Sequence, residues 1–240
     1  MGRMTTFAAA ALAVMAAAVT AAPATAAFID PGRYCSAGGA TIAPDDVSTD
    51  VGAGVQTASD CYGAFSIKEA KTALGGNGNG SEQQILRALW GDGLVAVGKW
   101  DGADTALSVN LGGLIITGIA ADLAGGWTIS WTADPTSVLP ARLTLAVLLK
   151  AGSANGANGT ADAGSWLFAD LYTPYGSTGA SGSFAIGWVN GGGQVPGLSH
   201  LTLAALLTPL QVPEPASAAL LLAGLAAVAA VRRRGRPSRP

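Results

Sequence analysis

The sequence predicts an all-β domain, an antiparallel β-sandwich or jelly roll, flanked by a short apolar helix at each end of the chain. Between residues 27 and 211, apolar and polar residues alternate along several runs, and glycine-rich breaks separate these runs. In the clearest run Trp127, Ile129 and Trp131 share one face, while threonine and serine occupy the other. Short alternating runs between turn residues are typical of antiparallel strands, and about seven of them indicate two packed sheets.

The remaining elements are predicted from the same signals. Further strands are expected at Leu94 to Trp100, Leu114 to Ile119, Leu143 to Leu149, Ser165 to Leu171, Ser183 to Val189 and His200 to Leu206. Asn-Gly pairs favour tight turns, which are expected at Asn77-Gly78-Asn79-Gly80, Asn155-Gly156 and Asn190-Gly191. A short helix is expected at Ser81-Glu82-Gln83-Gln84, because this stretch has the spacing of an N-terminal capping box ahead of apolar residues.

The amino end has the pattern of a secretory signal peptide. Arg3 precedes an apolar, alanine-rich stretch from Phe7 to Val19, and the small residues Ala24-Thr25-Ala26 follow it. A basic start, a short apolar region and an Ala-x-Ala site predict export, with residues 1–26 removed after Ala26. The alternative is a buried alanine-rich helix.

Cys35 and Cys61 are the two cysteines of the chain, and both follow the predicted cleavage site. In an oxidising compartment such a pair is expected to form a disulfide. Closing a loop of ~25 residues would add about 3 kcal/mol to the free energy of unfolding. A metal-binding pair is the alternative, although the single histidine, His200, is far away in the sequence.

The carboxyl end, residues 212–240, combines a proline-flanked glutamate, an apolar run and a basic cluster. These parts are Val212-Pro213-Glu214-Pro215, the uncharged residues 218–231, and Arg232, Arg233 and Arg234. As a helix the apolar run reaches ~24 Å at most, short of the ~30 Å hydrocarbon core of a bilayer. The arginines should remain cytoplasmic. The tail is therefore expected to hold the exported domain at the inner membrane only temporarily.

This order of parts resembles the PEP-CTERM sorting signal of Gram-negative bacteria that make exopolysaccharide. The resemblance implies recognition by exosortase, a membrane protease that cuts near the Pro-Glu-Pro segment and passes the protein to the cell surface or the polysaccharide matrix. Pro213, Glu214 and Pro215 would be the recognised positions. An ordinary carboxyl-terminal membrane anchor is the alternative.

The middle of the chain also resembles a group of exported domains that often precede such tails. The residues that carry this resemblance are Asp60-Cys61-Tyr62-Gly63-Ala64-Phe65, Gly98-Lys99, Leu149-Lys150-Ala151-Gly152 and Gly197-Leu198-Ser199-His200. That group has no assigned activity, so the resemblance implies none here. Where the group has a Gly-Asn-Asp stretch after the cysteine, this chain has Ser66-Ile67-Lys68-Glu69.

Charge and motifs exclude several classes of function. Residues 27–211 contain seven basic and 14 acidic residues, a formal charge of −7, which argues against nucleic-acid binding. His200 is the one histidine that could act as a general base, but Ser199 should point to the other side of its strand, and no Gly-x-Ser-x-Gly motif is present. No catalytic residue, metal ligand or cofactor site is therefore assigned.

Two aspartate-containing loops and one tryptophan could still contribute to a site. Asp101 with Asp104, and Asp45 with Asp46 and Asp50, could serve a glycosidase or bind calcium, although solvated turn residues are the simpler interpretation. Trp100 adjoins a predicted loop and is the best candidate for an exposed ring that stacks on a sugar.

The sequence thus favours an exported, non-enzymatic protein of the cell surface or the exopolysaccharide matrix of a biofilm, with exosortase as its processing partner. A carbohydrate-binding module of the extracellular matrix is the alternative. A secreted hydrolase would need His200 or a carboxylate pair in a cleft.

Overall fold

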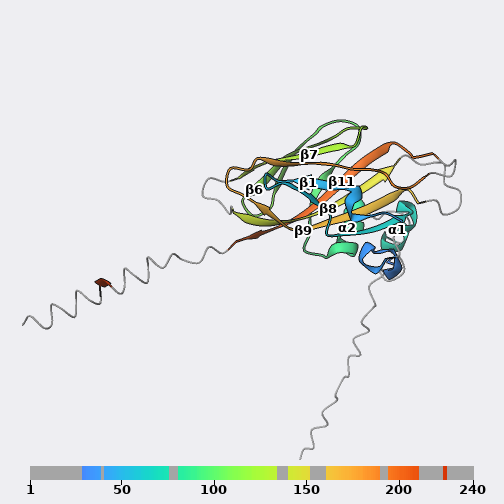
Figure 1. The fold of residues 1–240 in the computed structure, drawn as a ribbon, viewed down its shortest axis with the longest axis horizontal. Helices are drawn as coiled ribbons and strands as arrows, with labels where there is room; N and C mark the ends of the chain where they lie inside the picture. Colours follow the sequence, from blue (N-terminus) through green and yellow to red (C-terminus); the bar gives the residue numbers. More distant parts are fainter. Residues whose placement is uncertain are drawn as a thin grey trace, which may run out of the picture.

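The computed structural model describes residues 29–38, 41–75, 81–133, 140–151, 161–189, 194–210 and 224–225. Two antiparallel sheets form the domain (Figure 1). The six-stranded sheet has the order β2 (Val55–Thr57), β1 (Ser48–Asp50), β10 (Gly179–Ser183), β7 (Gly126–Ala133), β6 (Leu114–Ala121) and β5 (Thr105–Asn110). The five-stranded sheet has the order β3 (Asp60–Phe65), β9 (Ala163–Thr173), β8 (Ala141–Ala151), β11 (Leu198–Pro209) and β4 (Val95–Trp100). The predicted antiparallel β-sandwich is confirmed.

The main core lies between the two sheets. Trp127 and Trp131 on β7 point into it with exposed fractions of 2% and 1%, as the alternating pattern predicts. Thr128, Ser130 and Thr132 alternate with them on the opposite, exposed face. One face of the six-stranded sheet therefore fills the core, and the other is polar.

Two helices, α1 (Ile67–Gly75) and α2 (Glu82–Trp90), pack against the outer face of the five-stranded sheet. Strand β8 is consequently buried on both faces, and residues 145–149 are all fully inaccessible to solvent. Leu145 faces the core between the sheets, whereas Leu148 packs under the helices. This two-sided burial explains why the alternating pattern of β8 becomes a continuous apolar run.

Helix α2 begins at a capping box, and helix α1 begins at a serine that caps its first turn. The Ser81 side chain accepts a hydrogen bond of 3.1 Å from the Gln84 amide, and the Gln84 side chain accepts one of 2.6 Å from the Ser81 amide. The predicted capping box of α2 is thus confirmed. Helix α1 was not predicted, although Ser66 and Glu69 have the same Ser-x-x-Glu spacing and the Ser66 hydroxyl accepts a 3.3 Å bond from the Glu69 amide.

The prediction of a strand at Ser183 to Val189 is wrong. The strand in this region is β10, which ends at Ser183, and the following residues lie along the domain without a continuous ladder partner. Alternation persists there because Trp188 packs into the core and stacks on Trp166. Strands β1, β2, β3 and β5 were not predicted. Strands β1 and β2 have three residues each, which is too short to show an alternating pattern.

Several expectations fall on residues outside the described ranges. These are the signal peptide, the turns at 77–80, 155–156 and 190–191, and the carboxyl tail apart from residues 224–225. Among the described residues, no helix combines the length and the apolar character that crossing a membrane requires.

The predicted disulfide between Cys35 and Cys61 is present, with a Cα–Cα distance of 5.1 Å. It joins the short 3-10 turn Cys35–Ala37 to β3, and Cys61 is fully buried. The bridge therefore ties the amino-terminal segment to an edge strand of the five-stranded sheet.

Replacing both cysteines by alanine should lower the free energy of unfolding by about 3 kcal/mol, because the unfolded chain is no longer restricted by the closed loop. Denaturant titration under oxidising conditions measures this loss. Wild-type protein kept reduced should behave like the double variant. Equal stability of the oxidised wild type and the double variant would contradict the prediction.

Candidate functional site

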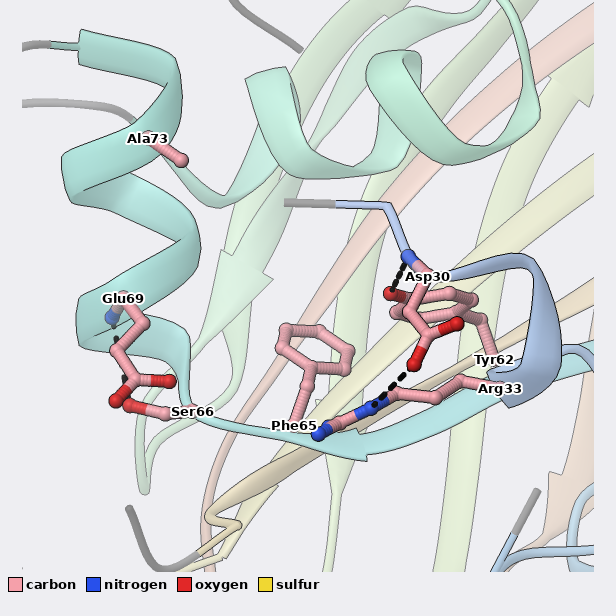
Figure 2. A pocket seen from close by; sticks show the side chains of 7 residues that line it. All are labelled: Asp30, Arg33, Tyr62, Phe65, Ser66, Glu69 and Ala73. Carbon is pink, nitrogen blue, oxygen red and sulfur yellow. Dashed lines mark hydrogen bonds and ion pairs between the residues drawn. The ribbon is translucent and has the colours of Figure 1, made fainter. Parts of the chain in front are cut away.

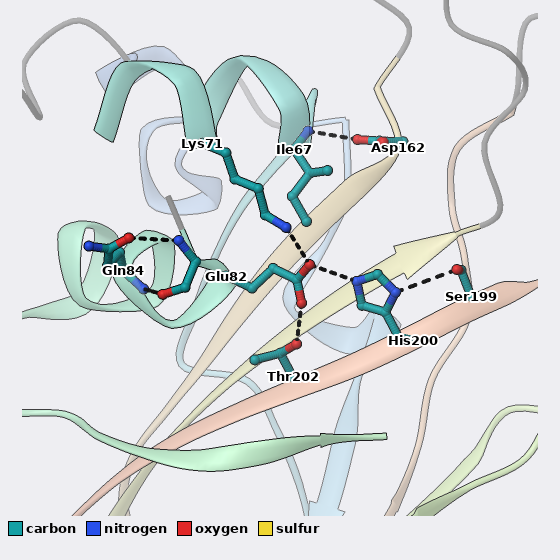
Figure 3. Close-up of polar contacts among 9 residues, drawn as sticks. Ile67, Lys71, Glu82, Gln84, Asp162, Ser199, His200 and Thr202 are labelled. Carbon is teal, nitrogen blue, oxygen red and sulfur yellow. Dashed lines mark hydrogen bonds and ion pairs between the residues drawn. The ribbon is translucent and has the colours of Figure 1, made fainter. Parts of the chain in front are cut away.

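A buried polar cluster lies between the two helices and the five-stranded sheet (Figure 3). Its members are Lys71 on α1, Glu82 on α2, and His200 and Thr202 on β11; we call it the Glu82 cluster. The capping box fixes the start of α2, so that Glu82 is its first residue. Side chains alternate along β11, and His200 and Thr202 therefore both face the helices rather than the core between the sheets.

The carboxylate of Glu82 is the centre of this cluster and is 8% exposed. Lys71 Nζ donates to Oε1 at 2.8 Å, and the Thr202 hydroxyl donates to Oε2 at 2.7 Å. His200 Nε2 lies 3.0 Å from Oε1, an ion-pair distance, although the angle at the ring nitrogen is not that of a hydrogen bond. Both oxygens of the carboxylate are therefore occupied.

These contacts decide the charge of Glu82. Burial raises the pKa of its carboxyl group, but the contacts with His200, Lys71 and Thr202 outweigh burial and hold this pKa well below its usual range. Glu82 is therefore ionised in the folded protein. Because its partners come from α1 and β11, the charge links the helical layer to the sheet.

Several residues by which the middle of the chain resembles a group of exported domains lie across one end of the five-stranded sheet. Phe65 is opposite Ala163, Ala163 is opposite Lys150, and Lys150 is opposite His200. Lys99 is opposite Thr202 on the next strand. Phe65, Lys150 and His200 thus lie in one row of the sheet, and Lys99 lies opposite the residue two positions further along β11. Ser66 to Glu69, where the chain departs from that group, forms the start of α1.

His200 has some of the contacts of a catalytic histidine but lacks a well-placed nucleophile. Ser199 is exposed and His200 is 6% exposed, so the two residues lie on opposite sides of β11 as predicted. The Ser199 hydroxyl is nevertheless 3.4 Å from His200 Nδ1, beyond the ~2.6–3.2 Å expected between a nucleophile and its base. Glu82, the carboxylate beside this histidine, was foreseen only as part of the capping box.

The aspartates singled out in the sequence act as turn residues. Asp50 Oδ1 accepts bonds from the Gly52 and Gly54 amides, and Asp46 Oδ2 accepts one from the Ala43 amide. Asp101 and Asp104 are exposed in the connection between β4 and β5. Within the described ranges, no group of three or more His, Cys, Asp or Glu side chains is placed to hold a metal ion.

The expectation that Trp100 is exposed is wrong. Trp100 is the last residue of β4 and is 4% exposed, because its side chain points into the core between the sheets. Four other tryptophans are also buried, namely Trp127, Trp131, Trp166 and Trp188. Trp90 is half-buried, and its Nε1 donates to the Ser165 hydroxyl at 2.8 Å. The tryptophans thus serve packing rather than a sugar-stacking surface.

A cavity of about 250 Å³ lies apart from the Glu82 cluster, where the amino-terminal turn meets β3 and α1 (Figure 2). The side chains of Asp30, Arg33 and Tyr62 in its lining bind each other or the backbone. The Tyr62 hydroxyl accepts a 2.9 Å bond from the Asp30 amide, and Arg33 Nη1 donates to the Ala64 carbonyl at 2.7 Å. Arg33 also forms an ion pair of 3.9 Å with Asp30. These contacts therefore hold the amino-terminal segment against β3.

Replacing Glu82 by glutamine should lower the free energy of unfolding at pH 7 by about 3–5 kcal/mol, because Lys71 and His200 lose their carboxylate. The folded-state pKa of Glu82 lies below the unfolded value of ~4.3, so its contribution is complete above that pH and is lost as the pH falls toward the folded-state pKa. Wild type should therefore lose more stability than the variant on acidification below about pH 4.3.

Denaturant titrations at pH 7 and at lower pH measure both effects. Glu69→Gln is the matched control, because Glu69 is an exposed residue in the first turn of α1 and its side chain is outside the cluster. The control should stay within about 0.5 kcal/mol of wild type. Similar losses in both variants would mean that the Glu82 contacts do not stabilise the fold.

Comparison with known proteins identifies the tail. The family model of the PEP-CTERM protein-sorting motif matches residues 211–234. Comparisons with curated proteins and with solved structures found no match. The matched stretch contains the predicted sorting-signal residues, from Val212-Pro213-Glu214-Pro215 to Arg232, Arg233 and Arg234. The chain therefore carries a PEP-CTERM sorting tail, which marks it as an exported protein that exosortase processes at the membrane.

Proposed function

We propose that the protein is a non-enzymatic structural component of the cell surface or of the extracellular polysaccharide matrix. Exosortase cuts its tail and releases the sandwich from a temporary attachment to the inner membrane. The mature domain then remains in the matrix as a disulfide-linked, compact unit.

The observation that carries this proposal is the position of the sorting tail relative to the fold. Strand β11 pairs with β8 along its whole length, from Leu198 to Pro209, and the sorting motif begins at residue 211. The last strand of the sheet thus ends just before the motif begins. Cleavage near Pro-Glu-Pro would remove the membrane segment and leave this strand complete.

The Glu82 cluster supports a structural rather than a catalytic role. A catalytic carboxylate or base must contact the reacting group, and both oxygens of Glu82 are already bound by side chains of its own fold. His200 is 6% exposed beneath the helices. These groups are placed to hold the helical layer on the sheet.

The carbohydrate-binding alternative loses its tryptophan candidate, because Trp100 is buried. Polysaccharide contact through polar or charged groups is compatible with this structure, and it would assist retention in the matrix.

The test is the intact mass and the cell fraction of the protein, expressed in otherwise identical hosts with and without exosortase. With exosortase, we expect a chain from Ala27 to the region of residues 213–216, recovered with the polysaccharide. Without exosortase, the chain should retain Arg232 to Arg234 and sediment with membranes. Glu214→Ala should resemble the host without exosortase, whereas Glu69→Ala should be processed normally.

Two results would contradict the proposal. If the chain keeps its arginines in the exosortase-bearing host, the tail is an ordinary anchor. If the trimmed chain washes free of the polysaccharide and of the cell surface, the protein is secreted and has no role in the matrix.

A further inference from the structure

We propose that a groove beside the Glu82 cluster binds an anionic group of an acidic polysaccharide, a sugar carboxylate or a sulfate ester. This inference rests on the proposed matrix function and names the chemistry by which the domain would be retained.

The groove lies at the amino end of α2, where α1, α2, β4 and β11 meet. It has a volume of about 250 Å³ and is lined by Lys71, Ser81, Glu82, Gln83, Lys99 and Thr202; we call it the Lys99 groove. Pockets for drug-sized ligands usually have volumes of ~300–1,000 Å³, so this groove suits one charged group or one sugar unit.

The charges of the groove favour an anion, although residues 27–211 carry a formal charge of −7. Three of the four lysines of the chain lie around Glu82, since Lys150 is opposite His200 on β8 and Lys71 and Lys99 line the groove itself. Glu82 is the one acidic residue of the lining. The two lysines therefore leave a positive excess at this place on an acidic domain.

Lys99 is the lysine of this groove that remains available to bind an anion, because Lys71 is paired with Glu82. The Glu82 carboxylate is engaged by Lys71, His200 and Thr202. Among the described residues, no carboxylate lies within 4.0 Å of the Lys99 ammonium group. Lys99 is half-buried, lies opposite Thr202 and lines the groove. The charge of the nearby Glu82 carboxylate is already balanced by its own partners. The Lys99 ammonium group is therefore free to attract an anion from solution.

Hydrogen-bond donors beside Lys99 would also contact the bound anion. The Ser81 hydroxyl accepts the Gln84 amide and so keeps its own proton to donate. Gln83 contributes a side-chain amide to the lining. The first turn of α2 adds the partial positive charge of a helix amino end. Hydroxyls and an amide beside an ammonium group match the oxyanion and the hydroxyl groups of an acidic sugar.

Two other grooves of the domain have the opposite character. One of about 380 Å³ is lined by Asp104 and Asp122, and another of about 410 Å³ contains Asp50. Neither lining contains a lysine or an arginine. They would repel the ligand that the Lys99 groove attracts.

The experiment measures binding of the protein purified from the exosortase-bearing host to three probes by titration calorimetry. The probes are an oligogalacturonate, its neutral methyl ester and a sulfated dextran oligomer. We expect binding of a charged probe, weakened by added salt, and little binding of the methyl ester. Preference between the two charged probes distinguishes the carboxylate from the sulfate ester.

Variants test whether Lys99 is responsible. Lys99→Gln should weaken binding by about ten- to hundredfold, because one charge-assisted hydrogen bond is lost, and Lys99→Arg should retain most of the affinity. Lys68→Gln is the matched control, since Lys68 is an exposed lysine of α1 outside the groove. Thermal unfolding confirms that each variant is folded.

The inference is overturned if neither charged probe binds better than the methyl ester, or if Lys99→Gln and Lys68→Gln have the same affinity as wild type. Failure of the site is distinguishable from failure of the proposed function. Protein that is recovered in the matrix without binding the probes refutes the site alone. Protein that binds through Lys99 but is absent from the matrix refutes the matrix role.

Discussion

The attachment of the helical layer to the sheet is centred on one buried charge, the carboxylate of Glu82. It lies where α1, α2 and β11 meet. Its partner Lys71 is near it in the sequence, whereas His200 and Thr202 are far from it. A buried carboxylate is costly unless every oxygen is bound, and here the helices and the sheet supply the bonds together. The arrangement of α1 and α2 over the sheet is therefore specified by a polar contact as well as by apolar packing.

The helical layer in turn makes the five-stranded sheet the middle of the molecule. Strands β8 and β11 are buried by the six-stranded sheet on one side and by the helices on the other. The six-stranded sheet has a polar outer face instead, with Thr128 and Ser130 exposed. The two sides of the domain thus differ, and the lysines gather on the side that bears the helices. This asymmetry places the Lys99 groove, where we propose that an anion binds, on the helical side of an acidic domain.

Local patterns predicted much of this fold. The alternation of Trp127 to Trp131, the capping box at Ser81 and the cysteine pair each specify a nearby structure, and all three are confirmed. The sequence could not place Glu82 beside His200, because 118 positions separate them and the contact depends on how the helices cross the sheet. Trp100 was misjudged for a similar reason, since its position beside a loop gives no information on which face of β4 it occupies.

Through these contacts Glu82 holds the helical layer on the sheet. Hydrogen–deuterium exchange of wild type and Glu82→Gln tests this directly, because it reports the stability of each element separately. We expect faster exchange of the α1 and α2 amides in the variant, with the amides of β8 still protected. Unchanged exchange in both helices would contradict it and would leave apolar packing as the force that holds the layers together.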